Sequence, residues 1–281
     1  MTTSSRELFK NYSEQLKPLY SEQEANSITF WLLEQYLGAT RKDILVNKYY
    51  DLGESAIEGA FQKVLTGVPI QQVLGWAPFY GREFNINPQV LIPRNETEEL
   101  VHFIIQETKL SEPRILDIGT GSGCIPITLA LEIPDAKLFA VDISPGAIKV
   151  AKENALLLKA AVQFYQLDIL SEDLPFQDLD LIISNPPYVR ESEKKLMHRN
   201  VLDHEPHLAL FVTDEDPLLF YREISKKAIG SLKTGGKLYF EINEAFVEET
   251  RQTMENLGFK NVKALQDLNG KFRIVSGSRE A

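Results

Sequence analysis

The chain has a single cysteine among its 281 residues, Cys124, so it cannot form an internal disulfide and gives no sign of an oxidising compartment. It has no run near the roughly 20 apolar residues of a membrane span, and residues 1–10 lack the apolar core of a signal peptide. Its 16 glycines and 14 prolines are too few and too scattered for a fibrous chain. We therefore expect a cytoplasmic globular protein with no membrane partner.

Positive charge is also scarce. Thirty Lys and Arg residues stand against 40 Asp and Glu residues, for a net charge of −10. Proteins that bind nucleic acid usually carry a basic surface, because neutralising phosphates supplies much of their affinity. The charge balance therefore favours a small-molecule or protein partner over stable binding of nucleic acid, although one local basic face would escape this count.

Residues 1–75 have the apolar spacing of helices. Ser21 is a predicted N-cap, with Glu24 three residues later, ahead of an apolar helix face. A second helix is predicted from Ser55 to Leu65, with Gly67 as its stop. This part shows no convergent set of catalytic residues, so we expect a small helical domain that docks or covers a partner.

Residues 76–95 differ in pattern. Residues 79–86 and 90–92 alternate in polarity and are separated by Asn87-Pro88, which predicts a hairpin or a bent ribbon with its break at that dipeptide. This segment is interpreted as the linker between two domains.

From residue 96 onward a helix leads into a regular alternation of strands and helices, which predicts an α/β fold with a doubly wound parallel sheet. Asn269-Gly270 between the last two strands is a hairpin signal, so the final strand should be antiparallel. The predicted strands are 114–118, 138–143, 162–167, 179–184, 236–242, 260–265 and 272–276. The predicted helices of this part are 96–110, 124–132, 145–159, 217–231 and 246–257.

A glycine-rich loop follows the first of these strands. Its residues are Gly119, Thr120, Gly121, Ser122 and Gly123. Glycines let the backbone turn tightly and let a ligand approach it, and the next helix directs free N–H groups at a negative group. The spacing differs from the dinucleotide fingerprint, and the loop lacks the lysine of a nucleotide P-loop.

With Asp117 two residues before the first glycine, this loop resembles that of Rossmann-type S-adenosylmethionine-dependent methyltransferases. The resemblance implies that the carboxylate of the methionine part lies at the helix N-terminus. Asp142 ends the second strand, 19 residues after Gly123, where a carboxylate can accept both ribose hydroxyls. Asp142 could instead cap the helix that follows, although Ser144 already fills the N-cap position of that helix. Asp168 and Ile169 end the third strand, where the adenine would lie.

The fourth strand is followed by Asn185, Pro186, Pro187 and Tyr188. Two prolines cannot continue a central strand, so they form a stiff loop at the edge where doubly wound sheets bind ligands. A planar amide or exocyclic nitrogen is a poor nucleophile. If Asn185 Oδ1 and the Pro186 carbonyl accept the two N–H protons of this nitrogen, its lone pair points toward a methyl donor. Tyr188 can pack against the flat acceptor group. Rate then comes mainly from positioning.

Nearly the whole chain resembles the bacterial peptide chain release factor glutamine methyltransferases, with the helical N-terminal part least specific. The resemblance implies S-adenosylmethionine as methyl donor, a release factor as protein partner, and methylation of the side-chain amide of the glutamine in its Gly-Gly-Gln loop. It also implies a substrate-docking domain over 1–75, a hairpin linker over 76–95 and a catalytic domain over 96–281. The matching segments are 69–75, 79–81, 90–98, 117–123, 185–188, 205–206, 209–210, 221–222 and 267–270.

Three positions depart from the family pattern. Asn95 stands where the family usually has Pro, Asn243 where it commonly has Gly, and Pro217 where it commonly has Gly. We expect none of them to touch the glycine loop or the loop at Asn185.

Three alternatives remain open. A sister family that methylates a ribosomal-protein glutamine shares the loop at Asn185, although Glu96-Thr97-Glu98 after Arg94 favours the release-factor branch. An adenine-N6 methyltransferase would use the same loop and predicts a basic face and salt-sensitive binding. A cofactor-binding module without turnover is disfavoured by the intact Asn185 and Pro186.

Two further features are not assigned a function. Pro206 between His204 and His207 disfavours a helix that would align these histidines as metal ligands, and no metal is expected. Cys124 is interpreted as a small residue at a helix start.

Overall fold

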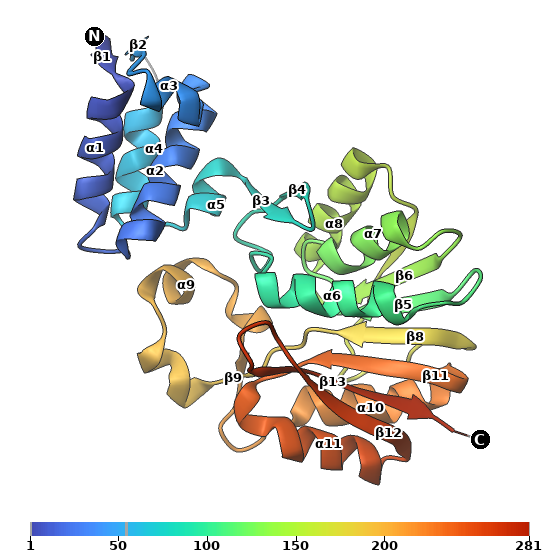
Figure 1. Cartoon of the computed structure of the whole chain (residues 1–281). Coiled ribbons are helices and arrows are strands. Elements are labelled where there is room, and N and C mark those ends of the chain that lie inside the picture. The colour runs from blue at the N-terminus through green and yellow to red at the C-terminus, as the bar shows by residue number, and fades with distance from the viewer. Residues whose placement is uncertain (1, 54–55, 281) are drawn as a thin grey trace. The chain divides into compact units, whose positions relative to one another are not determined.

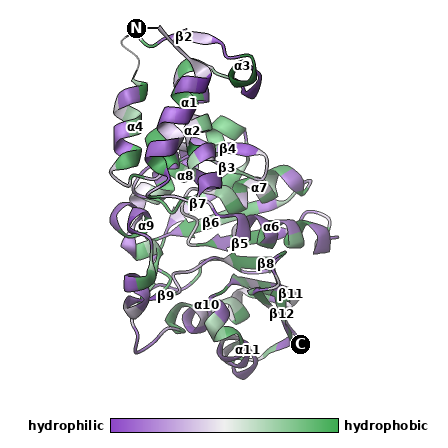
Figure 2. Cartoon of the chain, turned by 60° about the vertical axis from the view of Figure 1, so that its left-hand side comes forward, coloured by the Kyte–Doolittle hydropathy of each residue, from purple (hydrophilic) through white to green (hydrophobic). Residues whose placement is uncertain are grey.

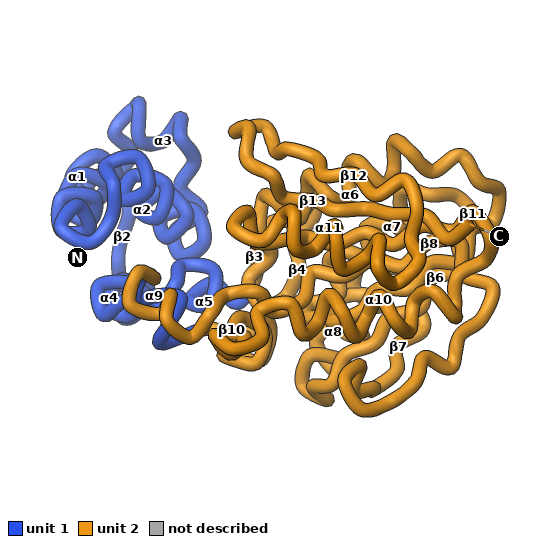
Figure 3. Tube along the Cα trace, turned by 90° about the horizontal axis from the view of Figure 1, so that it is seen from below, with its two compact units in different colours: residues 1–75, 198–204 blue, residues 76–197, 205–281 orange. Residues whose placement is uncertain are grey.

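The computed structural model describes residues 2–53 and 56–280. The chain forms two compact units, which Figure 3 colours separately. One consists of residues 1–75 and 198–204, and the other of residues 76–197 and 205–281. Each unit has its own apolar core, so each is described by itself.

The first unit is mainly helical. Ser21 caps α2 by accepting a hydrogen bond from the Glu24 backbone, as predicted, and Gly38 ends this helix in a left-handed conformation. Tyr12 of α1 and Phe61 of α4 stack with ring centroids 3.9 Å apart in the core. The predicted start of α4, Ser55, lies outside the described residues. The elements are β1 (Thr2–Ser4), α1 (Ser5–Leu16), α2 (Glu22–Leu37), α3 (Arg41–Leu45), β2 (Tyr49–Asp51), α4 (Ile57–Leu65), α5 (Ile70–Leu74) and α9 (Arg199–His204).

The amphipathic pattern explains this packing. Figure 2 shows both hydrophilic and hydrophobic residues along α1 and α4. The buried positions of α1 include Leu8, Tyr12 and Leu16, which recur every fourth residue and so share one helix face. α9 joins this unit from far along the chain, and the Gln72 amide donates to the His204 carbonyl at 2.7 Å.

The second unit begins with a hairpin of β3 (Trp76–Phe79) and β4 (Arg82–Asn85). Its turn is Tyr80-Gly81, and both residues have positive φ, 50° and 73°, as in a two-residue type I′ hairpin. The predicted break at Asn87-Pro88 was therefore wrong, and residues 90–92 are not a strand. Val90 and Ile92 are instead buried against α8, so their alternation records packing rather than strand pairing.

A seven-stranded sheet in the order β12-β13-β11-β8-β5-β6-β7 forms the centre of this unit. All neighbours pair in parallel except β13, which is antiparallel to β11 and β12, so the prediction for the last strand is confirmed. β6 and β7 lie on one side of β5, and β8, β11, β13 and β12 lie on the other. The boundary between β5 and β8 is therefore the switch point of the sheet. The strands are β5 (Arg114–Ile118), β6 (Lys137–Asp142), β7 (Val162–Gln166), β8 (Leu179–Ser184), β11 (Leu232–Glu241), β12 (Phe259–Gln266) and β13 (Phe272–Arg279).

Helices cover both faces of the sheet (Figure 1). Ile115 of β5 packs with α6 and α7, whereas Leu116 and Ile118 pack with α10 and α11. This alternation follows from the two-residue period of a strand and yields the three-layer α/β architecture that was predicted. The helices are α6 (Asn95–Glu107), α7 (Cys124–Glu132), α8 (Pro145–Leu158), α10 (Leu219–Ser231) and α11 (Val247–Asn256).

The remaining elements are short. β9 (Val189–Arg190) pairs in parallel with β10 (Phe211–Val212), and 3-10 turns occur at Glu191–Leu196, His207–Ala209 and Glu244–Phe246. Across the two described ranges, residues 2–53 and 56–280, no helix has the length and apolar character to cross a lipid bilayer.

Candidate active site

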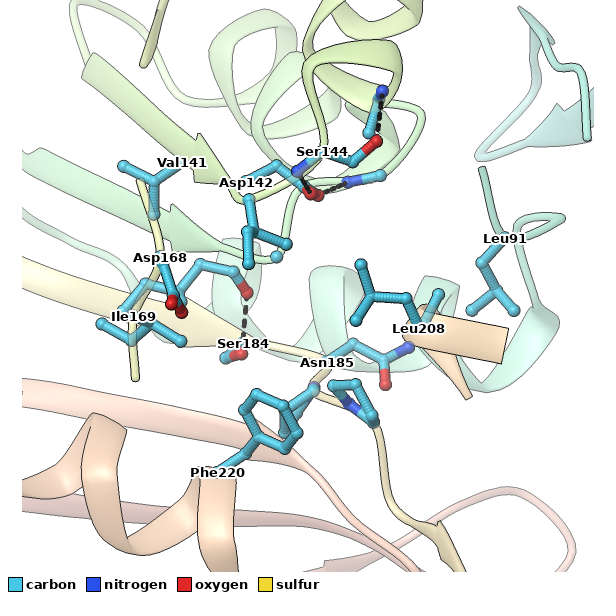
Figure 4. Close-up of a pocket in the computed structure, with 18 of the residues that line it drawn as sticks. Leu91, Val141, Asp142, Ser144, Asp168, Ile169, Ser184, Asn185, Leu208 and Phe220 are labelled. Atoms are coloured by element: carbon cyan, nitrogen blue, oxygen red, sulfur yellow. Dashed lines mark hydrogen bonds between the residues drawn. The ribbon is translucent and has the colours of Figure 1, made fainter. Parts of the chain in front are cut away.

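A pocket opens at the carboxyl ends of β5, β6 and β8, on the switch point of the sheet (Figure 4). Its walls come from the glycine loop, the loops after β6, β7 and β8, the segment after the hairpin, and α10. Eight of the residues predicted for the site line it: Gly119, Gly121, Asp142, Asp168, Ile169, Asn185, Pro186 and Pro187. Four others, Thr120, Ser122, Gly123 and Tyr188, do not.

Each glycine of the loop has a positive φ, between 54° and 81°. A Cβ at Gly121 would meet nothing within 4 Å, so the backbone there is open to a ligand. A Cβ at Gly123 would lie 2.9 Å from Ile127 and 3.0 Å from the Ala151 side chain. Gly123 therefore permits close packing of α7 on α8, which explains why it is needed although it does not line the pocket.

Asn154 of α8 holds this loop from behind. Its buried amide donates to the carbonyls of Ser122 and Asn85, both at 2.9 Å, and its oxygen accepts from the Asn85 backbone at 2.8 Å. One side chain thus joins the glycine loop to the end of the hairpin. No sequence pattern singles out Asn154, because its partners are distant in the chain.

Asp117 at the end of β5 is buried, and neither of its carboxylate oxygens has a hydrogen-bond partner among the described residues. Burial raises its pKa to about 7, and the nearby Thr120 hydroxyl opposes this rise. A buried carboxyl without a partner is costly unless protonated or paired with a cation. A positive charge nearby would therefore stabilise the ionised form of Asp117.

Asp142 faces the pocket with both oxygens already oriented by backbone N–H groups. Oδ2 accepts from Gly121 and Oδ1 from Ser144, each at 2.9 Å (Figure 4). Burial raises its pKa, while these two hydrogen bonds oppose the rise. Ser144 caps α8 through its own hydroxyl, so capping does not require Asp142. The remaining lone pairs of the Asp142 carboxylate are free to accept hydroxyls.

Asp168 also lines the pocket, but its carboxylate is engaged in a local turn. It accepts from the Ser171 hydroxyl at 2.7 Å and the Leu170 backbone at 2.9 Å, and the Ser171 bond lowers its pKa. Lys227 of α10 fixes the next residue by donating to the Ile169 carbonyl at 2.6 Å. The turn thus presents the side chain of Ile169 as an apolar wall.

The last residue of β8 and the first residue of the loop after it are both polar and both anchored. The Ser184 hydroxyl donates to the Ile118 carbonyl at 2.7 Å, which ties the ends of β8 and β5 together (Figure 4). The Asn185 amide nitrogen donates to the Thr97 hydroxyl at 3.1 Å. Pro186 and Pro187 then continue along the pocket wall.

Tyr188 differs from its predicted placement. Its ring packs on the apolar core instead of lining the pocket, and its hydroxyl donates to Glu241 Oε1 at 3.2 Å. Glu241 is buried at the end of β11, where burial raises its pKa to about 7. Thr97 donates to the other Glu241 oxygen at 2.6 Å. Sequence reasoning assigned no role to Glu241 or Thr97, because three separate segments bring them together.

Glu205 fixes the part of the pocket wall that contains Leu91 and Pro206. This buried carboxylate pairs with Arg94 and accepts from the Ile92 backbone at 3.1 Å, next to the pocket residues Leu91 and Pro206.

One expectation about the unusual positions was wrong. Asn243 does touch the loop at Asn185: its amide nitrogen donates to the Tyr188 carbonyl at 3.3 Å. Asn95 is the exposed first residue of α6, where Pro and Asn are both tolerated. Pro217 follows Asp216, which pairs with Arg222 of α10.

Two features noted in the sequence, Cys124 and a possible metal site, take no part in the chemistry of the pocket. Burial raises the pKa of the Cys124 thiol to about 12, so it stays protonated and unreactive near neutral pH. In the part of the chain that the structure describes, no three His, Cys, Asp or Glu residues are grouped as metal ligands.

Comparison with known proteins defines first the class. Residues 96–209 match the family model described as methyltransferase small domain. A solved structure titled as a methyltransferase from Pyrococcus furiosus superposes with a TM-score of 0.52 over 80% of this chain and 100% of that chain, at 16% identity. The family model and the fold together define the class of the protein as a methyltransferase with a Rossmann-like fold.

The sequence relatives then define the family. Release factor glutamine methyltransferases from Flavobacterium psychrophilum and Bacteroides thetaiotaomicron are each 42% identical to this chain. The first alignment covers 95% of this chain and 98% of the relative, and the second 95% and 97%. The chain belongs to the release factor glutamine methyltransferase family.

Proposed function

We propose that this protein transfers a methyl group from S-adenosylmethionine to the side-chain amide nitrogen of the glutamine in the Gly-Gly-Gln loop of a peptide chain release factor. The observation that carries the proposal is that one pocket contains both the glycine loop and the Asn185-Pro186-Pro187 loop. Membership of the family supports the choice of acceptor.

The residues of the pocket fit the methyl donor. Gly121 leaves the backbone open where the methionine part would lie, and α7 begins directly after the loop with N–H groups suited to a carboxylate. Asp117, which is buried beside the glycine loop and does not itself line the pocket, would favour a positive ammonium group there by its charge. Asp142 would accept the ribose hydroxyls, and Ile169 would pack against the adenine. S-adenosylmethionine supplies the electrophilic methyl group when bound.

Asn185 and Pro186 would orient the acceptor. The Asn185 oxygen and the Pro186 carbonyl each accept one N–H of the glutamine amide, so that the nitrogen lone pair points at the methyl group. The new N–CH₃ bond forms as the S–CH₃ bond breaks, and one N–H proton leaves to solvent. The loop contributes position rather than a strong base, and positioning supplies several kcal/mol of the barrier.

The helical unit formed by residues 1–75 and 198–204 is proposed to dock the body of the release factor. The segment 76–95 is proposed as the linker, and residues 96–197 and 205–281 as the catalytic domain. Because release factors act in translation, the proposed location is the cytoplasm, with no stable nucleic acid partner.

The test is methyl transfer with methyl-labelled S-adenosylmethionine, using a release factor and a copy whose loop glutamine is changed to alanine. Label on the first protein and none on the second establishes the reaction and the acceptor residue. Absence of label on both refutes the proposed partner. Parallel reactions with ribosomal proteins and with nucleic acid then decide between the two alternative acceptors.

A further inference from the structure

A chain of hydrogen bonds connects the loop at Asn185 to the buried Glu241. Asn185 Nδ2 is 3.1 Å from Thr97 Oγ1, and Thr97 Oγ1 is 2.6 Å from Glu241 Oε2. Tyr188 reaches the other oxygen, Glu241 Oε1, at 3.2 Å. The four residues come from the loop after β8, from α6 and from β11, so only the folded unit joins them.

The direction of each bond follows from the chemistry of the groups. An ionised carboxylate can only accept, so the single hydroxyl hydrogen of Thr97 points at Glu241. The Thr97 oxygen then has only lone pairs left for Asn185, and it must face the NH₂ end of that amide. The Asn185 oxygen, which has no hydrogen-bond partner among the described residues, is left for the substrate.

The loop is held on both sides of this contact. The Ser184 hydroxyl bonds to the Ile118 carbonyl, and the Asn243 amide bonds to the Tyr188 carbonyl. Since the backbone is fixed at both ends, the main freedom left to Asn185 is a half-turn of its amide. That half-turn would exchange its oxygen for an N–H donor, which would oppose the N–H groups of the substrate.

We propose that Thr97 and Glu241 are positioning residues for methyl transfer, which hold the Asn185 amide so that its oxygen accepts an N–H of the substrate amide. The assignment rests on the function proposed above, because it concerns how that acceptor is gripped.

The proposal has a consequence for pH. A protonated Glu241 can donate to Thr97, and Thr97 can then donate to the Asn185 oxygen, which reverses the amide. Turnover should therefore be lost as pH falls through the pKa of Glu241, which burial raises to about 7. The charges that act on Glu241 are Glu96 of α6, which raises this pKa, and Arg273 of β13, which lowers it. Tyr188, Tyr221 and Cys124 also lie close enough to interact, and burial raises the pKa of each, so they stay neutral.

The experiment compares Thr97→Val, which keeps the shape but removes the hydroxyl, with Thr97→Ser, which keeps the hydroxyl. Thr250→Val is the matched control, because Thr250 is equally buried in α11 and its hydroxyl has no hydrogen-bond partner among the described residues. We expect Thr97→Val to lower kcat by about 100-fold, with S-adenosylmethionine affinity changed less than about twofold. Thr97→Ser should recover most of the loss, and Thr250→Val should leave kcat unchanged.

A second measurement is independent of turnover. The side-chain NH₂ signals of Asn185, assigned by their loss in Asn185→Asp, should exchange with solvent at least about tenfold faster in Thr97→Val than in the parent protein. Relative to the intrinsic amide exchange rate at each pH, the protection of these protons should fall by the same factor from pH 8 to pH 6 in the parent protein and not in Glu241→Gln.

The outcomes separate the two proposals. A parent protein that does not label the release factor refutes the proposed function, while the exchange experiment still decides the role of Thr97. Equal exchange in the parent and Thr97→Val, or a kcat within about threefold of the parent, overturns the positioning role.

Discussion

Replacing Glu241 with glutamine should stabilise the protein at alkaline pH while impairing methyl transfer. Burial raises the pKa of Glu241 from 4.5 to about 7 in the folded protein, so between these values the native state binds more protons than the unfolded chain. The contribution of Glu241 to the stability of the parent protein therefore falls as pH rises from about 5 to 7, and levels off above the folded pKa.

The magnitude follows from the same values. At about 1.4 kcal/mol for each pKa unit, ionising Glu241 inside the protein costs about 3 kcal/mol relative to the unfolded state. Because Glu241 is fully buried, solvent screening does not reduce this figure. Glutamine has nearly the same shape and no charge, so Glu241→Gln should lose this pH dependence. Asp117 has a similarly raised pKa, but it is present in both proteins and cancels in the comparison.

The assay is denaturant unfolding of both proteins at pH 5 and pH 8. The two units can unfold separately, so a local probe is needed. Trp76 lies in the second unit, and a Trp31→Phe background leaves it as the only tryptophan. We expect the stability difference between Glu241→Gln and its parent to grow by roughly 2–3 kcal/mol from pH 5 to pH 8. Equal pH dependence in the two proteins would refute the assignment of Glu241 as a buried carboxyl ionised near neutrality.

The remaining predictions concern the pocket. Asn185→Ala should lower transfer by about 100-fold while calorimetry still detects S-adenosylmethionine binding, and unchanged transfer would revive the idea of a binding module without turnover. Asp142→Asn should weaken binding of the methyl donor by about tenfold, because an NH₂ would face the backbone N–H groups that the carboxylate now accepts. Gly121→Ala and Gly81→Ala should each cost about 1 kcal/mol, since both positions have positive φ, but only Gly121→Ala should reduce titrated donor affinity. Cys124 should resist iodoacetamide at pH 8 in the folded protein and react after denaturation, as measured by mass spectrometry.

Local pattern was enough for the strands of the seven-stranded sheet and for the helices that cover it. Alternating polarity and turn residues marked β5 to β8 and β11 to β13, whereas the two-residue strands β9 and β10 were not predicted. The same reasoning failed at residues 86–92. In these residues, buried coil and a strand would show the same alternation of polar and apolar side chains. Only the packing of Val90 and Ile92 on α8 distinguishes the coil from a strand.

The sequence alone determined the pocket's chemical parts: the glycine loop, Asp142, Ile169 and the Asn185 loop. Each is a contiguous motif at the end of a strand, and the carboxyl ends of parallel strands meet at one edge. Only the tertiary structure decided what orients those parts. Thr97, Asn154, Glu205 and Glu241 act across separations of 32 to 144 residues, the longest of them from Thr97 to Glu241. The tertiary structure also moved Tyr188 from the pocket to the core and brought Asn243 to the loop. The reason is physical: a buried hydrogen bond depends on distance in space, and a one-dimensional pattern carries that distance only for neighbours in the chain.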